Sequence, residues 1–503
     1  MVGVVATQKV DLGWYPPSNT SINNLTAALR GDGVYGFVFN TSDTPGAQYG
    51  IYNWCNMPHV RKTEYVKPGR GYQLRYVEVT QRHHKRTPYA SNAFPVESYR
   101  WDCDDQGLYY YGSSFGSHSK PPAEVFWKGH ISPINPFTPS GWIGTCQFPQ
   151  ITSAGLEDSW AHGRDLYEVY HELLGFLPSR RQDWRSSVAY RVTQNVITSQ
   201  VAGMLIHGMW ETTAAIPLAI QAAGVDSLEP QYTCRVGGDL FNTIKSPSNT
   251  DWKRHLEEAA NIFGKLDDIS GVPPNDSGFH ASFDHYFDNL SARQCHAKPL
   301  PCKLEGGVNS TTCVDQATAD AVYRMGQWEY SQIYRDARAS LAASAATYGV
   351  WTAELSRHLR DVMANKEGPL YFHNIAHDGS ISRLLSILQI DVMVWPGMGS
   401  EVVFELYERK SKTSLSRSGQ IAKSDARKMK SGRAYESKFF VRVLFGGKPL
   451  RSSNPSLGLL DMTPVEILLG YLDGLVGTDA SLVVGKCNGT LPVQEEMDRE
   501  KEK

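Results

Sequence analysis

The chain has 503 residues, of which 41% are hydrophobic, and its formal net charge at pH 7 is -2. This length is sufficient for a large core and one to three domains, and the hydrophobic content excludes a globally disordered chain. The nearly neutral balance argues against a nucleic-acid-binding protein, which is usually strongly basic. No uninterrupted apolar stretch is long enough to cross a bilayer, so we expect no membrane association.

The cysteines and sequons point to an oxidising compartment. The eight cysteines are scattered and include no Cys-x-x-Cys pair, which argues against a zinc or redox site. An even, dispersed set is typical of structural disulfides. Sequons for N-glycosylation occur at Asn19, Asn24, Asn40, Asn275, Asn289, Asn309 and Asn488. We therefore expect a secreted or extracellular glycoprotein, or alternatively a lumenal or vacuolar one. The start of the chain lacks the pattern of a signal peptide, which favours the cytosol instead.

The first half of the chain begins with an irregular segment. Residues 1–70 are rich in Gly, Asn, Ser, Thr and Pro, and we expect them to wrap a domain without forming one. Residues 71–80 alternate and predict a strand. Residues 151–177 carry apolar side chains at helical spacing, with Thr152 or Ser153 as the cap. Residues 188–192 predict a short strand, and residues 198–223 predict a long apolar helix.

The chain then changes character over residues 225–319, which are rich in Pro, Asp, His and Cys. We expect an inserted, mostly helical cap that is stapled by disulfides. Residues 317–364 are again helical in pattern. Strands are predicted at residues 370–375 and 402–407, on either side of a helix that begins near Ser380.

The last part of the chain contains a polar, lysine-rich segment at residues 408–438, which predicts an exposed loop or a disordered insertion. A strand at residues 439–445 and a final helix at residues 464–476 follow. We expect residues 481–503 to be a disordered tail.

Strands that alternate with helices predict an α/β fold, with a mixed, mainly parallel sheet flanked by helices. The inserted cap would divide this catalytic domain into residues 71–224 and 320–480.

The segment Arg82-His83-His84-Lys85-Arg86 directly follows the first predicted strand. The carboxyl ends of strands are where α/β sheets bind ligands. Arginine forks bind phosphate oxygens bidentately and stay charged, and a histidine held beside them can attack phosphorus. The alternative is a set of basic residues on an exposed turn.

The pair His377-Asp378 follows the predicted strand at residues 370–375. If this strand is a neighbour of the first one, both motifs meet at one edge of the sheet. An aspartic acid at that edge can protonate a departing alcohol. Asp378 is alternatively a cap of the following helix, a role that does not exclude catalysis.

Together the two motifs resemble the signatures of the histidine acid phosphatases, the second branch of the histidine phosphatase superfamily. The segment from Arg82 to Pro88 resembles Arg-His-Gly-x-Arg-x-Pro, and Ala376-His377-Asp378 resembles the His-Asp signature. Residues 151–155 and 401–407 resemble the linking blocks of that family. The resemblance covers roughly residues 72–480, is strongest to fungal members, and implies a phosphoglycerate mutase-like fold.

The resemblance implies a secreted acid phosphatase that hydrolyses phosphomonoesters through a phosphohistidine intermediate. His83 would be the nucleophile and Asp378 the general acid, whereas Arg82, Arg86 and His377 would bind the phosphate. The resemblance implies no metal and no cofactor. It does imply an acidic working pH. The identity of the substrate, the disulfide pairing and the oligomeric state are left open.

Two residues depart from the family's pattern. His84 stands where the first signature has glycine, and it is either bulk beside the nucleophile or a further donor.

A block resembling Arg-Ser-Thr-x-x-x-Arg-Thr supplies the family's third phosphate-binding arginine. Here Arg191 matches its first arginine, but Ile197 takes the place of the second. A lost charged hydrogen bond of ~1.5–3 kcal/mol would lower the rate on the order of 10- to 100-fold, unless Arg191 or a neighbour compensates. The alternative function is a weakened or inactive phosphatase fold that binds a phosphorylated ligand or a protein partner.

Overall fold

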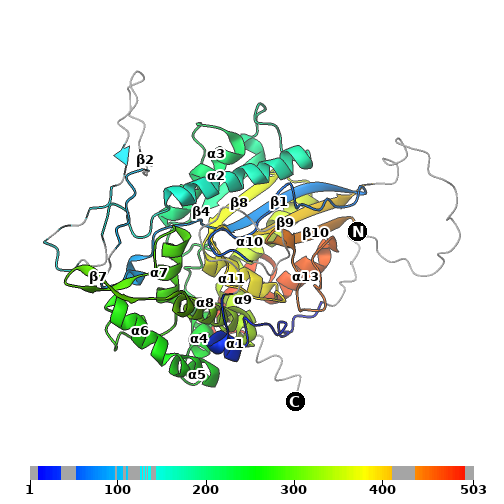
Figure 1. The fold of residues 1–503 in the computed structure, drawn as a ribbon. Coiled ribbons are helices and arrows are strands. Elements are labelled where there is room, and N and C mark those ends of the chain that lie inside the picture. The colour runs from blue at the N-terminus through cyan, green and yellow to red at the C-terminus, as the bar shows by residue number, and fades with distance from the viewer. Residues whose placement is uncertain are drawn as a thin grey trace, which may run out of the picture.

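A computed structural model describes residues 10–34, 52–96, 99–105, 109–110, 125–126, 128–130, 132, 134–137, 143–410 and 437–492. A mixed sheet lies at the centre of this structure, with helices on both of its faces (Figure 1). This arrangement confirms the predicted fold class.

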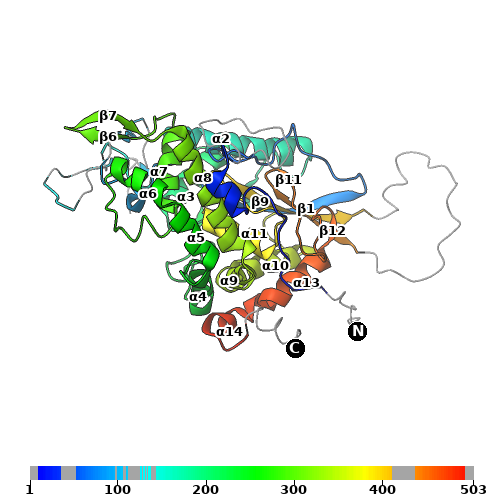
Figure 2. The ribbon, with the colours of Figure 1, turned by 60° about the horizontal axis from the view of Figure 1, so that its bottom comes forward.

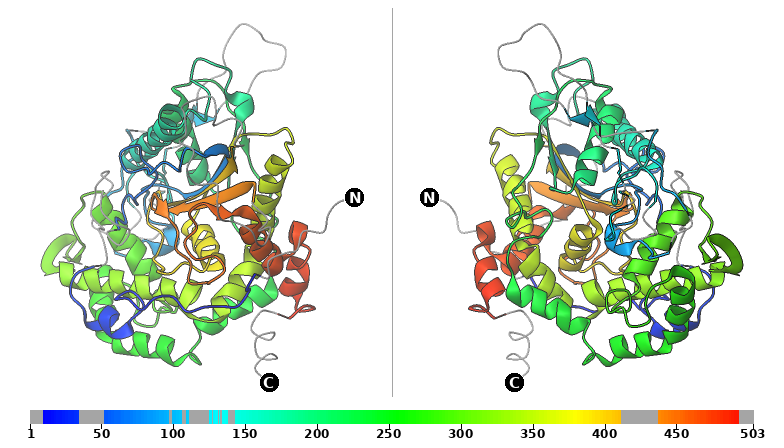
Figure 3. Two further views of the ribbon diagram at one scale, coloured as in Figure 1. Left: turned by 90° about the vertical axis from the view of Figure 1, so that its right-hand side faces the viewer. Right: turned by 90° about the vertical axis from the view of Figure 1, so that its left-hand side faces the viewer.

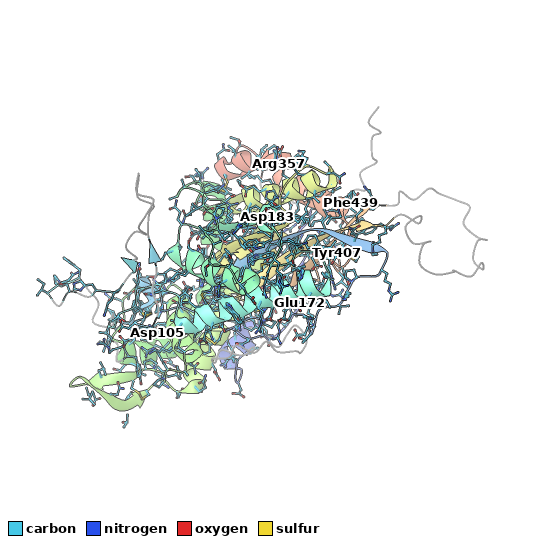
Figure 4. The ribbon with its side chains drawn as sticks, turned by 90° about the horizontal axis from the view of Figure 1, so that it is seen from above. Asp105, Glu172, Asp183, Arg357, Tyr407 and Phe439 are labelled. Atoms are coloured by element: carbon cyan, nitrogen blue, oxygen red, sulfur yellow. A yellow bond between two sulfur atoms is a disulfide. The ribbon has the colours of Figure 1, made fainter. Side chains whose placement is uncertain are left out.

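The strands of the central sheet follow an order that differs from their order in the chain. In space they are β11 (Lys448–Pro449), β10 (Phe439–Phe445), β9 (Glu401–Arg409), β1 (Tyr72–Arg82), β8 (Tyr371–Ala376), β4 (Val188–Val192) and β5 (Leu218–Ala219), and β12 (Thr463–Pro464) pairs with β10. The strands from β1 to β5 in this order are parallel, whereas β9 and β10 run antiparallel to their neighbours. Tyr407 of β9 and Phe439 of β10 lie at one end of the molecule, and Asp105 lies toward the other (Figure 4).

The pairing of β1 with β8 brings the two sequence motifs together. The register of this parallel pair sets Arg82 beside Ala376, so both strands end at the same edge of the sheet. The strand that we predicted at residues 71–80 continues to Arg82, which is therefore its last residue and does not lie beyond it. His83 and His377 leave the sheet side by side.

Helical layers bury both faces of the sheet (Figure 3). One layer contains α2 (Ser153–Tyr167) and α3 (Val196–Trp210), and the other contains α9 (Ala339–Thr347), α10 (Gly349–Met363), α11 (Asp378–Ile387) and α13 (Val465–Val476). On β9, Phe404 packs in the core on the α13 side, whereas the adjacent Val403 packs in the core with α2 and α3. Successive side chains of a strand point to opposite faces, which explains why apolar residues occupy adjacent positions of β9.

The helices over residues 151–223 are shorter than predicted. Thr152 caps α2 as expected, because its hydroxyl oxygen accepts a hydrogen bond from the Gly155 N–H at 3.3 Å. After α2, the chain forms a π-helical turn over Glu168–Leu173. The predicted helix at residues 198–223 ends instead at Trp210, because Glu211 adopts a left-handed conformation with φ of 50°. Such a residue is a common helix terminator.

Most of residues 225–331 are helical. This part of the chain contains α4 (Arg235–Ile244), α5 (Thr250–Glu258), α6 (Ala260–Ser270), α7 (Asp284–Cys295) and α8 (Gln316–Ser331), together with the hairpin of β6 (Cys302–Glu305) and β7 (Val308–Cys313). The short helix α1 (Leu25–Arg30), from the N-terminal segment, lies against α8 (Figure 2). The described chain before residue 150 also contains the pair of β2 (Tyr109–Tyr110) and β3 (Val125–Phe126).

All eight cysteines form disulfides. The pairs are Cys55–Cys295, Cys103–Cys146, Cys234–Cys487 and Cys302–Cys313. The third pair joins the start of α4 to α14 (Val483–Asn488), a helix that lies within the tail we expected to be disordered from residue 481. That expectation is wrong as far as Asn488, because the buried Cys487 anchors the segment. The predicted lysine-rich loop lies mostly, at residues 411–436, outside the described residues.

The sequons differ in exposure. Asn289 is only 1% exposed and its amide is bonded within the core, so the sequon there does not present a glycan acceptor. The asparagines at positions 19, 24, 275, 309 and 488 are exposed, and Asn40 lies outside the described residues. Within the part of the chain that the structure describes, none of the helices has the length and apolar content needed to cross a membrane.

Candidate active site

The sequence motifs meet in one cavity of about 460 Å³ at the carboxyl edge of β1 and β8. The lining includes all the residues that we expected to bind phosphate or to react: Arg82, His83, Arg86, His377 and Asp378. The end of β1 and the loop after it position the first motif. The end of β8 and the first turn of α11 position the second.

His83 is held as a neutral imidazole with a defined tautomer. Its Nδ1–H donates to the backbone carbonyl of His84 at 2.9 Å, which leaves the lone pair on Nε2. Burial lowers the pKa of His83 well below its ordinary value, and the positive charges of Arg86 and Arg82 lower it further. A nucleophilic histidine must be unprotonated, and this environment keeps His83 unprotonated even in mild acid.

Asp378 is tied to Arg82 and Trp395. Its Oδ2 accepts from Arg82 Nη2 at 3.0 Å and from the Trp395 indole N–H at 2.8 Å. Burial alone would raise the pKa of Asp378, but the charge of Arg82, the bond from Trp395 and the charge of Arg86 outweigh it, so the pKa lies below its ordinary value. Asp378 is also the first residue of α11, where its Oδ1 accepts from the N–H of Gly379. It lies within the first turn of the helix and lines the cavity, whereas the cap position, which we had weighed for Asp378, is occupied by His377.

Arg86 has a buried carboxylate partner that the motifs did not indicate. Asp288, from α7, lies 3.0 Å from Arg86 Nη1, and both side chains are 4% exposed. Nη1 also donates to the Thr87 carbonyl at 2.9 Å. The Nε atoms of Arg82 and Arg86 are buried and make no hydrogen bond among the described residues. Unpaired buried donors are rare, and these two belong to arginines that line the cavity.

The block that supplies the third arginine in the family has a different role here. Ile197 belongs to the first turn of α3. Its side chain is fully buried in the core and does not line the cavity. Arg191 does not compensate, because it lies outside the cavity lining and binds Glu354 at 2.8 Å and Asp226 at 3.2 Å. Thr193, from the same block, reaches the site instead, with its hydroxyl 2.9 Å from Nε2 of His377.

His84 faces away from the cavity into a buried polar cluster. This cluster consists of His84, Gln81, His162, Glu401, His59 and His373. The Gln81 amide donates to His84 Nε2 at 3.0 Å, and His162 Nε2 lies 2.9 Å from Glu401. The ring also fills the space beside Gly399, where a Cβ would collide with it and where φ is 71°. The His84 side chain is therefore packing behind the nucleophile and not a further phosphate donor.

Comparison with known proteins gives one curated relative and a set of solved structures. No protein-family model matches this chain. Counting factor 60 of Dictyostelium discoideum is 23% identical over 349 residues, which are 67% of this chain and 77% of that protein. The apo structure of Hafnia alvei phytase covers 82% of this chain and 99% of its own, with 12% identity and a TM-score of 0.49. The phytase from D. castellii covers 92% and 88%, with 13% identity and a TM-score of 0.46.

The position of Ile197 predicts the result of restoring an arginine there. In Ile197→Arg the guanidinium would enter a fully buried apolar site, and an unpaired buried charge costs about 3–5 kcal/mol. We expect urea denaturation at pH 7 to show a loss of this size, and Gln194→Arg, at an exposed position of the same block, to change stability by less than about 0.5 kcal/mol. A stable Ile197→Arg protein with faster phosphate ester hydrolysis would contradict this assignment of Ile197 to the core.

The buried histidine cluster predicts a loss of stability in acid. Burial lowers the folded-state pKa of His84, His162 and His373, so the unfolded chain binds protons that the folded chain does not bind. Stability contributed by these neutral rings is complete above about pH 6.5 and falls as the pH decreases toward their folded-state pKa values. Each ring contributes a slope of about 1.4 kcal/mol per pH unit.

Denaturation by urea at pH 7, 6 and 5 measures this slope. We expect His84→Gln to reduce it by roughly one histidine's share, about 1.4 kcal/mol per pH unit. His207, which is exposed on α3, supplies the matched control, because His207→Gln removes a ring that faces solvent in both states. Equal slopes in the wild-type protein and in His84→Gln would show that His84 is not held neutral by the fold.

Proposed function

We propose that this protein is an acid phosphatase that hydrolyses phosphomonoesters through a phosphohistidine at His83. One observation carries the proposal. His83 is buried and neutral with its Nδ1–H bound to a carbonyl, and it lines the same cavity as two arginines whose buried Nε donors are unpaired. A nucleophile and an anion receptor thus share one site.

In the proposed first step, Arg82 and Arg86 hold the oxygens of the substrate phosphate. The lone pair of His83 Nε2 attacks phosphorus, the bond from phosphorus to the ester oxygen breaks, and Asp378 gives its proton to that oxygen. In the second step, the Asp378 carboxylate takes a proton from water as the water oxygen attacks phosphorus. The phosphorus–nitrogen bond breaks, and inorganic phosphate leaves.

The contacts of Asp378 explain why this chemistry requires acid. In the free site Asp378 is a carboxylate, because Arg82 and Trp395 stabilise its charge. A phosphate that engages Arg82 competes for this stabilisation, and its own negative charge raises the pKa of the neighbouring carboxyl. A substrate that arrives as the monoanion also brings the proton that Asp378 needs. Both effects favour turnover below neutral pH.

The compartment is part of the same proposal. The pairing of all eight cysteines and the exposed sequons support a secreted or lumenal glycoprotein.

We further propose that residues 225–319 act as a cap on the catalytic domain, because α7 supplies Asp288 to the cavity wall.

A second candidate function is a phosphate-binding protein with weak turnover or none. The pairing of Arg86 with Asp288 and the placement of Ile197 in the core favour it, since both reduce the positive charge available to the transition state. Binding of phosphate without any ester hydrolysis would distinguish this function from the first.

Two variants and two substrates test the acid phosphatase proposal. His83→Ala should abolish hydrolysis of both p-nitrophenyl phosphate and glycerol 2-phosphate near pH 5, by at least about 10³-fold. Asp378→Asn should lower kcat for glycerol 2-phosphate by about 10²- to 10⁴-fold, because an alkoxide needs a proton in order to leave. The loss for p-nitrophenyl phosphate should be much smaller, because p-nitrophenolate leaves unprotonated. Equal activity of His83→Ala and the wild-type protein would refute the proposal.

A further inference from the structure

Carboxyl groups form much of the cavity wall outside the catalytic residues. Asp284 and Asp288 stand one turn apart on α7, and Glu229 comes from the loop before α4. Glu229 lies 3.6 Å from Nε2 of His377, and Asp284 is close enough to Asp288 and Asp378 to feel their charges. These acids therefore lie in the same cavity as the catalytic candidates His83 and Asp378.

Two of the three arginines in the described cavity lining are paired with carboxylates. Arg82 pairs with Asp378, and Arg86 pairs with Asp288, each at 3.0 Å. Arg383 donates to the Gly379 carbonyl at 2.9 Å and to the Thr347 hydroxyl at 3.0 Å. Among the described residues, the lining of this cavity contains no lysine, and its three arginines face four carboxyl groups.

The histidines of the cavity do not change this balance. Burial lowers the pKa of His83, His285 and His377, so all three rings are neutral around pH 7. The proposed function places one phosphate at Arg82 and Arg86, which both line the cavity. On the described wall, a second phosphate on the same substrate would meet Arg383, which donates to two neutral oxygens, and the two carboxyl groups of Glu229 and Asp284.

We propose that, as the pH rises toward neutral, Glu229 and Asp284 restrict the site to phosphomonoesters whose leaving group carries no further negative charge and disfavour polyphosphorylated substrates. This inference rests on the proposed function, whose phosphate site it extends. The disfavoured class includes inositol polyphosphates. Tyr330, stacked on Trp395 with ring centroids 3.9 Å apart, offers such a leaving group an uncharged surface in the same cavity.

The restriction should depend on pH. Burial and the charge of Asp226 raise the pKa of Glu229. Burial, with the charges of Asp288 and Asp378, raises the pKa of Asp284 to about 7. Carboxyl groups with raised pKa values are protonated in acid and ionised in base. Repulsion of a polyanion should therefore increase as the pH rises from 5.0 to 7.5.

Binding to the wild-type protein, measured by calorimetry, tests the inference without turnover. Inorganic phosphate is the single-anion probe, and myo-inositol hexakissulfate is the polyanion that the protein does not hydrolyse as a phosphate ester. We expect the hexakissulfate to bind at most threefold more tightly than phosphate at pH 5.0. At pH 7.5 we expect it to bind at least tenfold more weakly than phosphate does at the same pH. If phosphate binds and the hexakissulfate binds a hundredfold more tightly at pH 7.5, the inference alone is wrong. If phosphate itself does not bind at either pH, the proposed function is wrong and the inference fails with it.

The double variant Glu229→Gln/Asp284→Asn identifies the residues. It should tighten hexakissulfate binding at pH 7.5 at least fivefold more than it tightens phosphate binding, and the gain should shrink at pH 5.0. The matched control is Asp251→Asn/Glu257→Gln, which removes the same charge from exposed positions on α5 and should leave both affinities within twofold. An equal gain in the control would mean that total charge, and not the cavity wall, sets the preference. A variant that does not fold leaves the wild-type pH series as the deciding measurement.

Discussion

The site depends on the parallel pairing of β1 with β8. Their register sets Arg82 beside Ala376, so the residues that follow each strand enter the same space although they are almost 300 positions apart in the chain. Helical layers bury both faces of the sheet, which leaves the carboxyl edge as the place where polar side chains can meet a ligand. The nucleophile and the acid are therefore held by rigid strands, and only the cavity walls come from helices and loops.

Charge within this edge is closely balanced. Burial, together with the charges of two arginines, keeps His83 neutral, and each arginine has a carboxylate partner, Asp378 or Asp288. A site built this way attracts one phosphate by hydrogen bonds and desolvated charge, without a large positive field. The same balance is consistent with both proposals: turnover in acid, where Asp378 receives its proton, and weaker binding of substrates with several phosphates as the pH rises toward neutral.

How much of this could be predicted from the sequence depended on whether a residue's partners are local. Strand alternation and the two motifs were enough to place His83, Arg82 and Asp378, because Arg82 ends β1, His83 follows it directly and Asp378 comes two residues after β8. Asp288 was not predictable, since its partner Arg86 lies 202 positions away and only the packing of α7 joins them. Thr193 belonged to a block that we examined, but motif spacing directed attention to Ile197.

Other differences have physical reasons that the sequence contained only in part. His84 follows His83 directly, and successive extended residues point to opposite sides, so its inward direction was open to inference. Helix α14 was missed because a disulfide to Cys234, and not local pattern, holds Cys487.

We propose above all that the phosphoryl group is transferred to Nε2 of His83, because Nδ1–H is bound to the His84 carbonyl. Quenching the wild-type protein in alkali during turnover of p-nitrophenyl phosphate, followed by peptide mass spectrometry and ³¹P NMR, tests it directly. The account predicts an Nε2-phosphohistidine on the peptide that contains His83; turnover without any phosphopeptide, or phosphorylation of a different residue, would contradict it.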